Sequence, residues 1–190
     1  ASRRNPVVYR DVPGGLKYSI HRTHSRIRIR MSAEKLKFKL ELHATMWDKP
    51  PVAEILIDEK SYFKGDITTT EDKPTLIEFE HECEEGKDHR LVIKRSGKGK
   101  NQTVVNDKGD LLKDQLLNIK SIEIDEIDIG SLVYEGTYTP DYPEPWATQQ
   151  REAGVELQES FKNVTRMGHN GTWQFKFTSP FYMWLLENLY

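Results

Sequence analysis

Apolar and polar residues alternate in one short segment after another between Ser25 and Ile129. The clearest segment places four apolar side chains two residues apart, at Leu36, Phe38, Leu40 and Leu42. Charged or polar residues fill the positions between them. Because successive side chains of a β-strand point to opposite faces, this period predicts strands with one buried and one solvated face. We therefore expect an all-β chain folded as an antiparallel β-sandwich.

Turn residues divide the alternating region into strands and hairpins. Residues 35–46 form the longest expected strand, and the pair Pro50-Pro51 ends it because proline cannot donate a hydrogen bond to a ladder. Gly86 lies in a second expected turn, where it can supply a positive φ. Two hairpins are predicted, one pairing residues 53–58 with 61–64 and the other pairing residues 75–83 with 89–95.

Two more strands and a helical segment are expected further along the chain. Residues 116–129 are rich in β-branched side chains, which predicts a central strand, and a change of parity predicts a bulge near Ser121. Residues 170–177 are predicted to form the final strand. Residues 148–161 have helical character but include Gly154, so only short helices are expected there.

The last expected element is a C-terminal helix over residues 180–190. Ser179 is a candidate N-cap, and Pro180 suits the first helical position. The helix sequence that follows, FYMWLLENLY, is apolar nearly all round. Such a helix must be covered, either by its own domain or by a neighbouring chain.

A length of 190 residues allows one sandwich domain with a sizeable core and is too short for two large domains. Proline and glycine punctuate the first part, so we assign residues 1–24 to a basic N-terminal arm. Residues 25–190 are assigned to one sandwich domain, which carries an aromatic loop at 134–146. No run of about 18 apolar residues occurs, so no membrane span is expected. The first residues also lack the apolar stretch of a signal peptide.

Charge is unevenly distributed along the chain, although the net charge is only −2. Residues 1–40 hold eleven Lys and Arg against two acids, a net of +9, whereas the rest holds 17 basic and 28 acidic groups, a net of −11. One interpretation is an arm that docks on an acidic surface through Arg3, Arg4 and Arg10. The other is pairing within the chain, between basic early strands and acidic later residues such as Glu123.

Residues that could carry catalysis or bind a metal do not form a familiar motif. Cys83 is the single cysteine and lies in the acidic sequence HECEE, which disfavours a thiolate and leaves no internal disulfide. His21 and His24 lie among arginines that would repel a cation. Residues 106–110 (NDKGD) fit an Asx-type hairpin turn better than a calcium loop. We therefore expect a non-enzymatic protein without catalytic residues, cofactor or metal.

Aromatic residues gather in the loop after the main alternating region. The loop contains Tyr134, Tyr138, Tyr142 and Trp146. Three interpretations stay open: the rings stack on sugars, they anchor a protein interface, or they cover the sandwich core.

Longer tracts of the sequence carry two resemblances. The segments AEILIDEKSYFKG, TLIEFEHECEEGKDHRLVIKRSGKGKNQT and LLNIKSIEIDEIDI, within Val52–Gly130, resemble the jelly-roll sandwich of carbohydrate-binding modules, which implies a polysaccharide partner. The tracts PDYPEPWATQQREAGVEL and MGHNGTWQFKFTSPFYMWLLENLY are similar to uncharacterised virion or accessory proteins of tailed bacteriophages of marine bacteria. This second resemblance implies a virion protein, synthesised in the host cytoplasm, whose partners are other virion proteins or further copies of itself.

The leading hypothesis is therefore a non-enzymatic phage virion structural or adaptor protein that acts through protein–protein assembly contacts. The alternative is a carbohydrate-binding module that recognises a host-surface polysaccharide. Nucleic-acid binding is not expected, because aromatic residues that could stack on bases are sparse among the early arginines. The residues assigned to assembly contacts are Arg3, Arg4, Arg10, Tyr142, Trp146, Tyr182, Trp184 and Tyr190.

Overall fold

The structure is a computed structural model that describes residues 32–189. These residues belong to the unit Met31–Tyr190, which is described here by itself. The strands are β1 (Ala33–Thr45), β2 (Val52–Ile57), β3 (Lys60–Asp66), β4 (Thr75–Glu84), β5 (Asp88–Ser96), β6 (Val104–Val105), β7 (Leu111–Lys113), β8 (Leu116–Ile124), β9 (Ile127–Asp128), β10 (Thr137–Pro140), β11 (Phe161–Lys162), β12 (Arg166–Met167) and β13 (Gly171–Thr178). The helices are the 3₁₀-helix η1 (Gly130–Glu135), α1 (Trp146–Glu152) and α2 (Phe181–Asn188).

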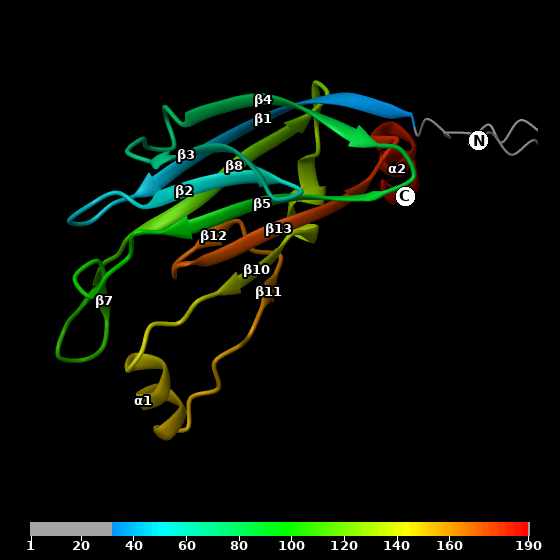
Figure 1. Cartoon of the computed structure of the whole chain (residues 1–190). Helices are drawn as coiled ribbons and strands as arrows, with labels where there is room; N and C mark the ends of the chain where they lie inside the picture. The colour runs from blue at the N-terminus through cyan, green and yellow to red at the C-terminus, as the bar shows by residue number, and fades with distance from the viewer. Residues whose placement is uncertain (1–31, 190) are drawn as a thin grey trace, which may run out of the picture. The chain divides into compact units, whose positions relative to one another are not determined.

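Two antiparallel sheets make up the domain (Figure 1). The first sheet has the order β12-β8-β1-β4, with β9 paired to β8, and the second has the order β11-β10-β13-β5-β2-β3. Strands β6 and β7 form a separate two-stranded hairpin. The predicted all-β, antiparallel sandwich is therefore confirmed, and its core lies between the two sheets.

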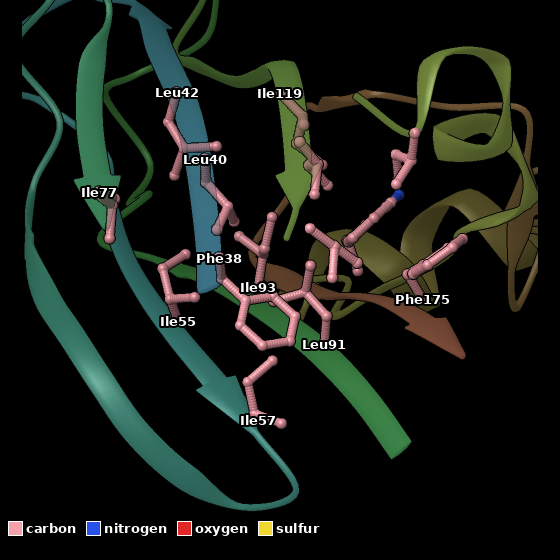
Figure 2. Close-up of a cluster of buried hydrophobic side chains, with 14 of the residues drawn as sticks. Phe38, Leu40, Leu42, Ile55, Ile57, Ile77, Leu91, Ile93, Ile119 and Phe175 are labelled. Carbon is pink, nitrogen blue, oxygen red and sulfur yellow. The ribbon is translucent and has the colours of Figure 1, made fainter. Parts of the chain in front are cut away.

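The alternation in β1 builds one side of the core, as the sequence predicted. Its four apolar side chains from Leu36 to Leu42 are all at most 3% exposed. Figure 2 shows Phe38 and Leu40 of this strand facing the side chains of Ile55 and Leu91, which come from the second sheet. Burying each such side chain is worth about 1.5–3 kcal/mol, so the period of β1 alone is a large term in stability.

The C-terminal strand β13 supplies the aromatic part of the core. It lies between β10 and β5 near the middle of the second sheet, and Trp173, Phe175 and Phe177 on its inner face are at most 1% exposed. The predicted final strand over 170–177 is therefore confirmed.

One of the two predicted hairpins forms, and the other does not. β2 pairs with β3 across the turn at Asp58-Glu59, as predicted. β4, however, pairs with β1 in the first sheet, whereas β5 pairs with β2 and β13 in the second. Gly86 has the expected positive φ of 76°, but the turn that contains it carries the chain from one sheet to the other. The prediction was wrong because β4 and β5 each bury one face and meet across the core rather than edge to edge.

Two local predictions near β8 have different outcomes. The register of β8 against β1 shifts between Glu41 and Leu42, where Ser121 is followed in the pairing by Ile119, so the bulge is confirmed. The expected strand over 116–129 is too long, because positive φ values at Asp125 and Glu126 turn the chain back into β9.

Two further turn and helix predictions are refined by the structure. In the β6–β7 hairpin, Asn106 Oδ1 accepts hydrogen bonds from the backbone N–H groups of Lys108 and Asp110 at 2.9 and 2.8 Å, which confirms the Asx-type turn. Of the expected helical region 148–161, only the first part is helical, since α1 ends at Glu152 just before Gly154.

Helix α2 is present, but Ser179 does not cap it. The residue that precedes the helix is Pro180, and the capping oxygen comes from Glu34 on β1. Glu34 Oε1 accepts hydrogen bonds from the Phe181 backbone N–H at 2.6 Å and from Ser179 Oγ at 2.7 Å. A carboxylate at a helix N-terminus satisfies a free N–H and favours the helix dipole, so β1 fixes where α2 begins.

Candidate functional site

The aromatic loop folds into a cluster around His169. The ring centroids of Tyr142 and Trp146 lie 5.0 and 5.4 Å from that of His169, and 5.9 Å from each other. Tyr142 Oη donates a hydrogen bond to the Gln158 carbonyl at 2.8 Å, which fixes the loop. The rings are tilted rather than coplanar, and Trp146 is 37% exposed, so one indole remains open to solvent.

The other two aromatic residues of the loop have different surroundings. Tyr138 lies on β10, is 4% exposed and donates a hydrogen bond to the His169 carbonyl at 2.6 Å. It therefore covers the core, which was one of the three interpretations. Tyr134 lies on η1 and is 47% exposed, outside the cluster that contains Tyr142.

The imidazole of His169 is held in an environment that disfavours its charged form. Burial lowers its pKa below 6.5, and the positive charges of Lys98 and Arg95 lower it further, while Asp114 opposes them. A histidine with a lowered pKa in the folded state contributes stability that is present above pH 6.5 and is lost as the pH falls toward the folded pKa.

We expect His169→Gln to reduce the pH dependence of unfolding. Because the unfolded chain takes up the proton more readily, the denaturation midpoint of the wild type should fall between about pH 7.5 and about pH 5, and the variant should lose part of that fall. Tyr142→Phe is the control, since it perturbs the same cluster without removing the imidazole. Equal pH dependence in wild type and His169→Gln would contradict the assignment.

The terminal helix α2 has one buried and one exposed apolar face. Phe181 and Leu185 are at most 4% exposed and pack against the core, and Trp184 is partly buried against Phe175 at 5.6 Å between ring centroids. The residues on the opposite side are 41–60% exposed; they are Tyr182, Met183, Leu186 and Leu189. Of the predicted contact residues on this helix, Tyr182 lies on the exposed face, whereas Trp184 lies on the packed side.

The remaining predicted contact residues lie outside the described part of the chain. They are Arg3, Arg4, Arg10 and Tyr190. The alternative explanation of the uneven charge, pairing within the chain, is seen for β1. Lys39 lies 3.3 Å from Glu123, and Lys35 pairs with Glu80 on β4.

A second polar cluster lies where β4 and β5 approach the turn between β2 and β3. One ligand-type atom from each of His81, Cys83 and His89 lies within 4.8 Å of the other two. The Asp58 carboxylate binds His89 Nδ1 and lies 3.7 Å from His81 Nε2. Cys83 is fully buried and His89 is 4% exposed, so three chemically reactive groups converge at the core boundary.

The ring nitrogens that face away from this cluster are hydrogen-bonded. His81 Nδ1 lies 2.6 Å from the Tyr62 hydroxyl, and His89 Nε2 lies 3.0 Å from the Glu84 carbonyl. Asp58 Oδ1 accepts a hydrogen bond from the Arg90 backbone N–H at 2.8 Å. Each group is therefore oriented by a partner behind it.

The same surroundings shift the pKa values of the cluster. Burial raises the pKa of Cys83 to about 12, with smaller contributions from Asp58 and Glu34. The thiol is thus protonated at neutral pH in the isolated chain, as expected, but mainly because it is buried rather than because of its neighbours in HECEE. Burial lowers the pKa of His81. For His89, burial acts to lower the pKa, but hydrogen bonds to Asp58 and Glu84 outweigh it and the pKa is raised.

This cluster was not predicted from the sequence. His81 and Cys83 are two residues apart on β4, so strand periodicity places both on one face. His89 follows the turn after β4. The pattern H-x-C with a further histidine after the turn could therefore have predicted these three ligands from the sequence. The contacts that Asp58 and Tyr62 make with the histidines could not be predicted from the sequence, because they depend on how the two sheets pack.

Comparison with known proteins gives two weak structural likenesses. No family model and no curated protein matches the chain. One likeness is with the carbohydrate-binding module vCBM60, which superposes with a TM-score of 0.43 and 6% identity, over 74% of this chain and 89% of that chain. That structure is described in a study of circular permutation between two families of calcium-dependent carbohydrate-binding modules. The same module in complex with galactobiose gives a TM-score of 0.41 and 7% identity, over 73% of this chain and 96% of that chain.

Within residues 32–189, no helix combines the length and the hydropathy needed to cross a membrane.

Proposed function

We propose that this chain is a non-enzymatic structural or adaptor protein of a phage particle that associates with further copies of itself through α2. The observation that carries this proposal is the exposed apolar face formed by Tyr182, Met183, Leu186 and Leu189. Monomeric proteins seldom leave a continuous apolar patch in water, and such patches mark interaction sites. The phage origin is supported by the sequence resemblance alone.

The spacing and charge of α2 favour a second copy as the partner. Tyr182, Leu186 and Leu189 are four and three residues apart, so they follow one stripe of the helix. Glu187 is the only charged residue of α2, so two such helices can meet without bringing much like charge together. A single patch that contacts itself is what a two-fold dimer requires. In this proposal Arg3, Arg4 and Arg10 pair with acidic groups of a neighbouring molecule.

The test is the mass in solution of the full chain across a concentration series, measured by light scattering. We expect the wild type to self-associate and Leu186→Glu to remain monomeric, because the variant places a charge in the centre of the apolar face. Trp146 was also predicted to be a contact residue, but it lies on α1, outside the apolar face of α2, so in this proposal Trp146→Ala should associate like the wild type. A strictly monomeric wild type at all concentrations would overturn self-association through α2.

The alternative function is polysaccharide binding at the aromatic cluster. The exposed indole of Trp146, supported from behind by Tyr142 and His169, favours it, since a partly open aromatic ring can stack on a sugar. Under this alternative, the wild type is retained on immobilised polysaccharide, Trp146→Ala is not, and Leu186→Glu is retained normally. The two variants thus separate the two functions.

A further inference from the structure

We propose that His81, Cys83 and His89, together with Asp58, form a zinc site that joins the two sheets of the sandwich. The proposal does not rest on the function proposed above. It follows from the convergence of three ligand-type side chains, from the carboxylate of Asp58 beside the two histidines, and from the groups that orient them.

The donor atoms and their spacing suit a zinc ion. Three ligand atoms, one each from His81, Cys83 and His89, lie within 4.8 Å of one another. Small side-chain rotations would bring all three to the distance of about 2.0–2.3 Å from a single ion at which zinc binds its ligands. Asp58 is not one of these three residues, but its carboxylate contacts His89 Nδ1 and lies 3.7 Å from His81 Nε2, so it is the nearby side chain that we assign as the fourth ligand. Four protein ligands complete a tetrahedral, closed site.

The two imidazoles are oriented as metal-binding histidines are. A histidine that binds a metal through one nitrogen usually makes a hydrogen bond through the other, which fixes its tautomer. His89 Nε2 faces the Glu84 carbonyl at 3.0 Å, and His81 Nδ1 faces the Tyr62 hydroxyl at 2.6 Å. His81 Nε2 and His89 Nδ1 are therefore the nitrogens that face the cluster, where His89 Nδ1 contacts the Asp58 carboxylate that would share the ion with it. Both of these nitrogens point toward Asp58.

The chemistry of the ligands favours zinc over other metal ions. A thiolate, two imidazoles and one carboxylate suit a borderline-soft ion such as zinc, whereas calcium and magnesium take oxygen ligands. A blue-copper site would need a weak axial ligand in place of the carboxylate. The ion can enter from a surface pocket that is lined by Tyr62 and His81 and flanked by Lys60 and Glu82.

The position of the site gives the ion a structural role. β4 is an edge strand of the first sheet, β5 belongs to the second sheet, and the two share no ladder. Tyr62 of β3 stacks on Phe79 of β4 at 4.3 Å between centroids, so side-chain packing closes this edge. A zinc ion bound by β4, β5 and the β2–β3 turn would add bonds between the sheets and stabilise the folded state by mass action.

The experiment is a titration of the metal-stripped full chain with zinc by calorimetry, and with cobalt(II) by absorption. We expect one zinc ion per chain, a thiolate-to-cobalt charge-transfer band and the strong visible bands of tetrahedral cobalt. Zinc should also raise the melting temperature. Cys83→Ser should remove the charge-transfer band, and His81→Gln should weaken zinc binding by more than about 100-fold, since losing even an orienting group costs about 10–100-fold.

Two further variants control for folding and for adventitious binding. Tyr62→Phe keeps the ring that stacks on Phe79 but removes the hydroxyl, so it should weaken zinc binding by about 10–100-fold while the fold persists. His43→Gln removes a histidine on β1 that is outside the cluster and should bind zinc like the wild type. The proposal is overturned if the chain binds no zinc, if His81→Gln and Tyr62→Phe bind it as the wild type does, or if bound cobalt shows no thiolate band.

Discussion

Replacing Arg95 by alanine is expected to lower the free energy of unfolding by about 3–5 kcal/mol, because the lost buried hydrogen bonds and the cavity left behind both contribute. Arg95 lies near the end of β5 and is 2% exposed. Its guanidinium donates hydrogen bonds to the backbone carbonyl and the side-chain carbonyl of Gln115, at 2.8 and 2.7 Å. Burial lowers its pKa to about 10, so the group stays charged at neutral pH.

The effect is large because Arg95 links the two sheets, since β5 belongs to the second sheet and Gln115 immediately precedes β8 of the first. It also donates to the Gly168 carbonyl at 3.3 Å, so it holds the chain before β8 and the loop between β12 and β13. Removing it leaves the buried acceptors of Gln115 unpaired and opens a cavity. Arg90→Ala, on the same strand with an exposed side chain, is the matched control and should change stability by less than about 0.5 kcal/mol. Denaturant midpoints of the two variants measure the difference, and similar midpoints would contradict the assignment.

Replacing Gly136 by alanine is the second substitution expected to destabilise the fold strongly, by about 3 kcal/mol or more, at the upper end of overpacking. Gly136 follows η1 in extended backbone, with φ of −60° and ψ of 146°, so alanine meets no backbone strain there. Its added Cβ, however, would lie closer than 3.0 Å to three atoms of the Trp173 indole. Trp173 is fully buried and cannot move aside without disturbing the core.

Gly168→Ala is the control for this substitution. A Cβ at Gly168 meets only the tip of Leu116, at an ordinary 3.6 Å, so the variant should stay within about 1 kcal/mol of the wild type. Chemical denaturation at unchanged slope compares the two variants. If both alanines are tolerated equally, the close packing of Gly136 against the indole is not a determinant of stability.

Sequence periodicity predicted those strands that can be recognised without knowing which other strands they pair with. The strands β1 and β13 bury one face each, and the alternation of apolar side chains in them identified that face directly. It also located the bulge of β8, because a bulge changes which residues share a face. Turn signals were less informative. Gly86 marks a turn, but a turn glycine does not determine whether the flanking strands pair or separate into two sheets.

Features that depend on distant contacts were not predictable from local sequence. The cap of α2 comes from Glu34, which is 147 positions before Phe181 in the chain. The predicted cap Ser179 was locally reasonable but hydrogen-bonds to Glu34 instead. The cluster of His81, Cys83 and His89 combines a feature visible in the local sequence with one that depends on distant contacts. Its strand spacing was visible in the sequence, whereas Asp58 joins it only through the packing of the two sheets.

The position of β13 has a consequence for the order in which the protein is made. Of the described strands, β1 leaves the ribosome first, and it pairs with β4 and β8, which follow later. The edge of β5 that pairs with β13 stays open until residues 171–178 are synthesised. Partners so distant in sequence make folding slow, because long loops must close before their contacts form. The core can therefore close only after synthesis of this strand, and a nascent chain that stops before Trp173 exposes an unpaired sheet edge to chaperones and proteases.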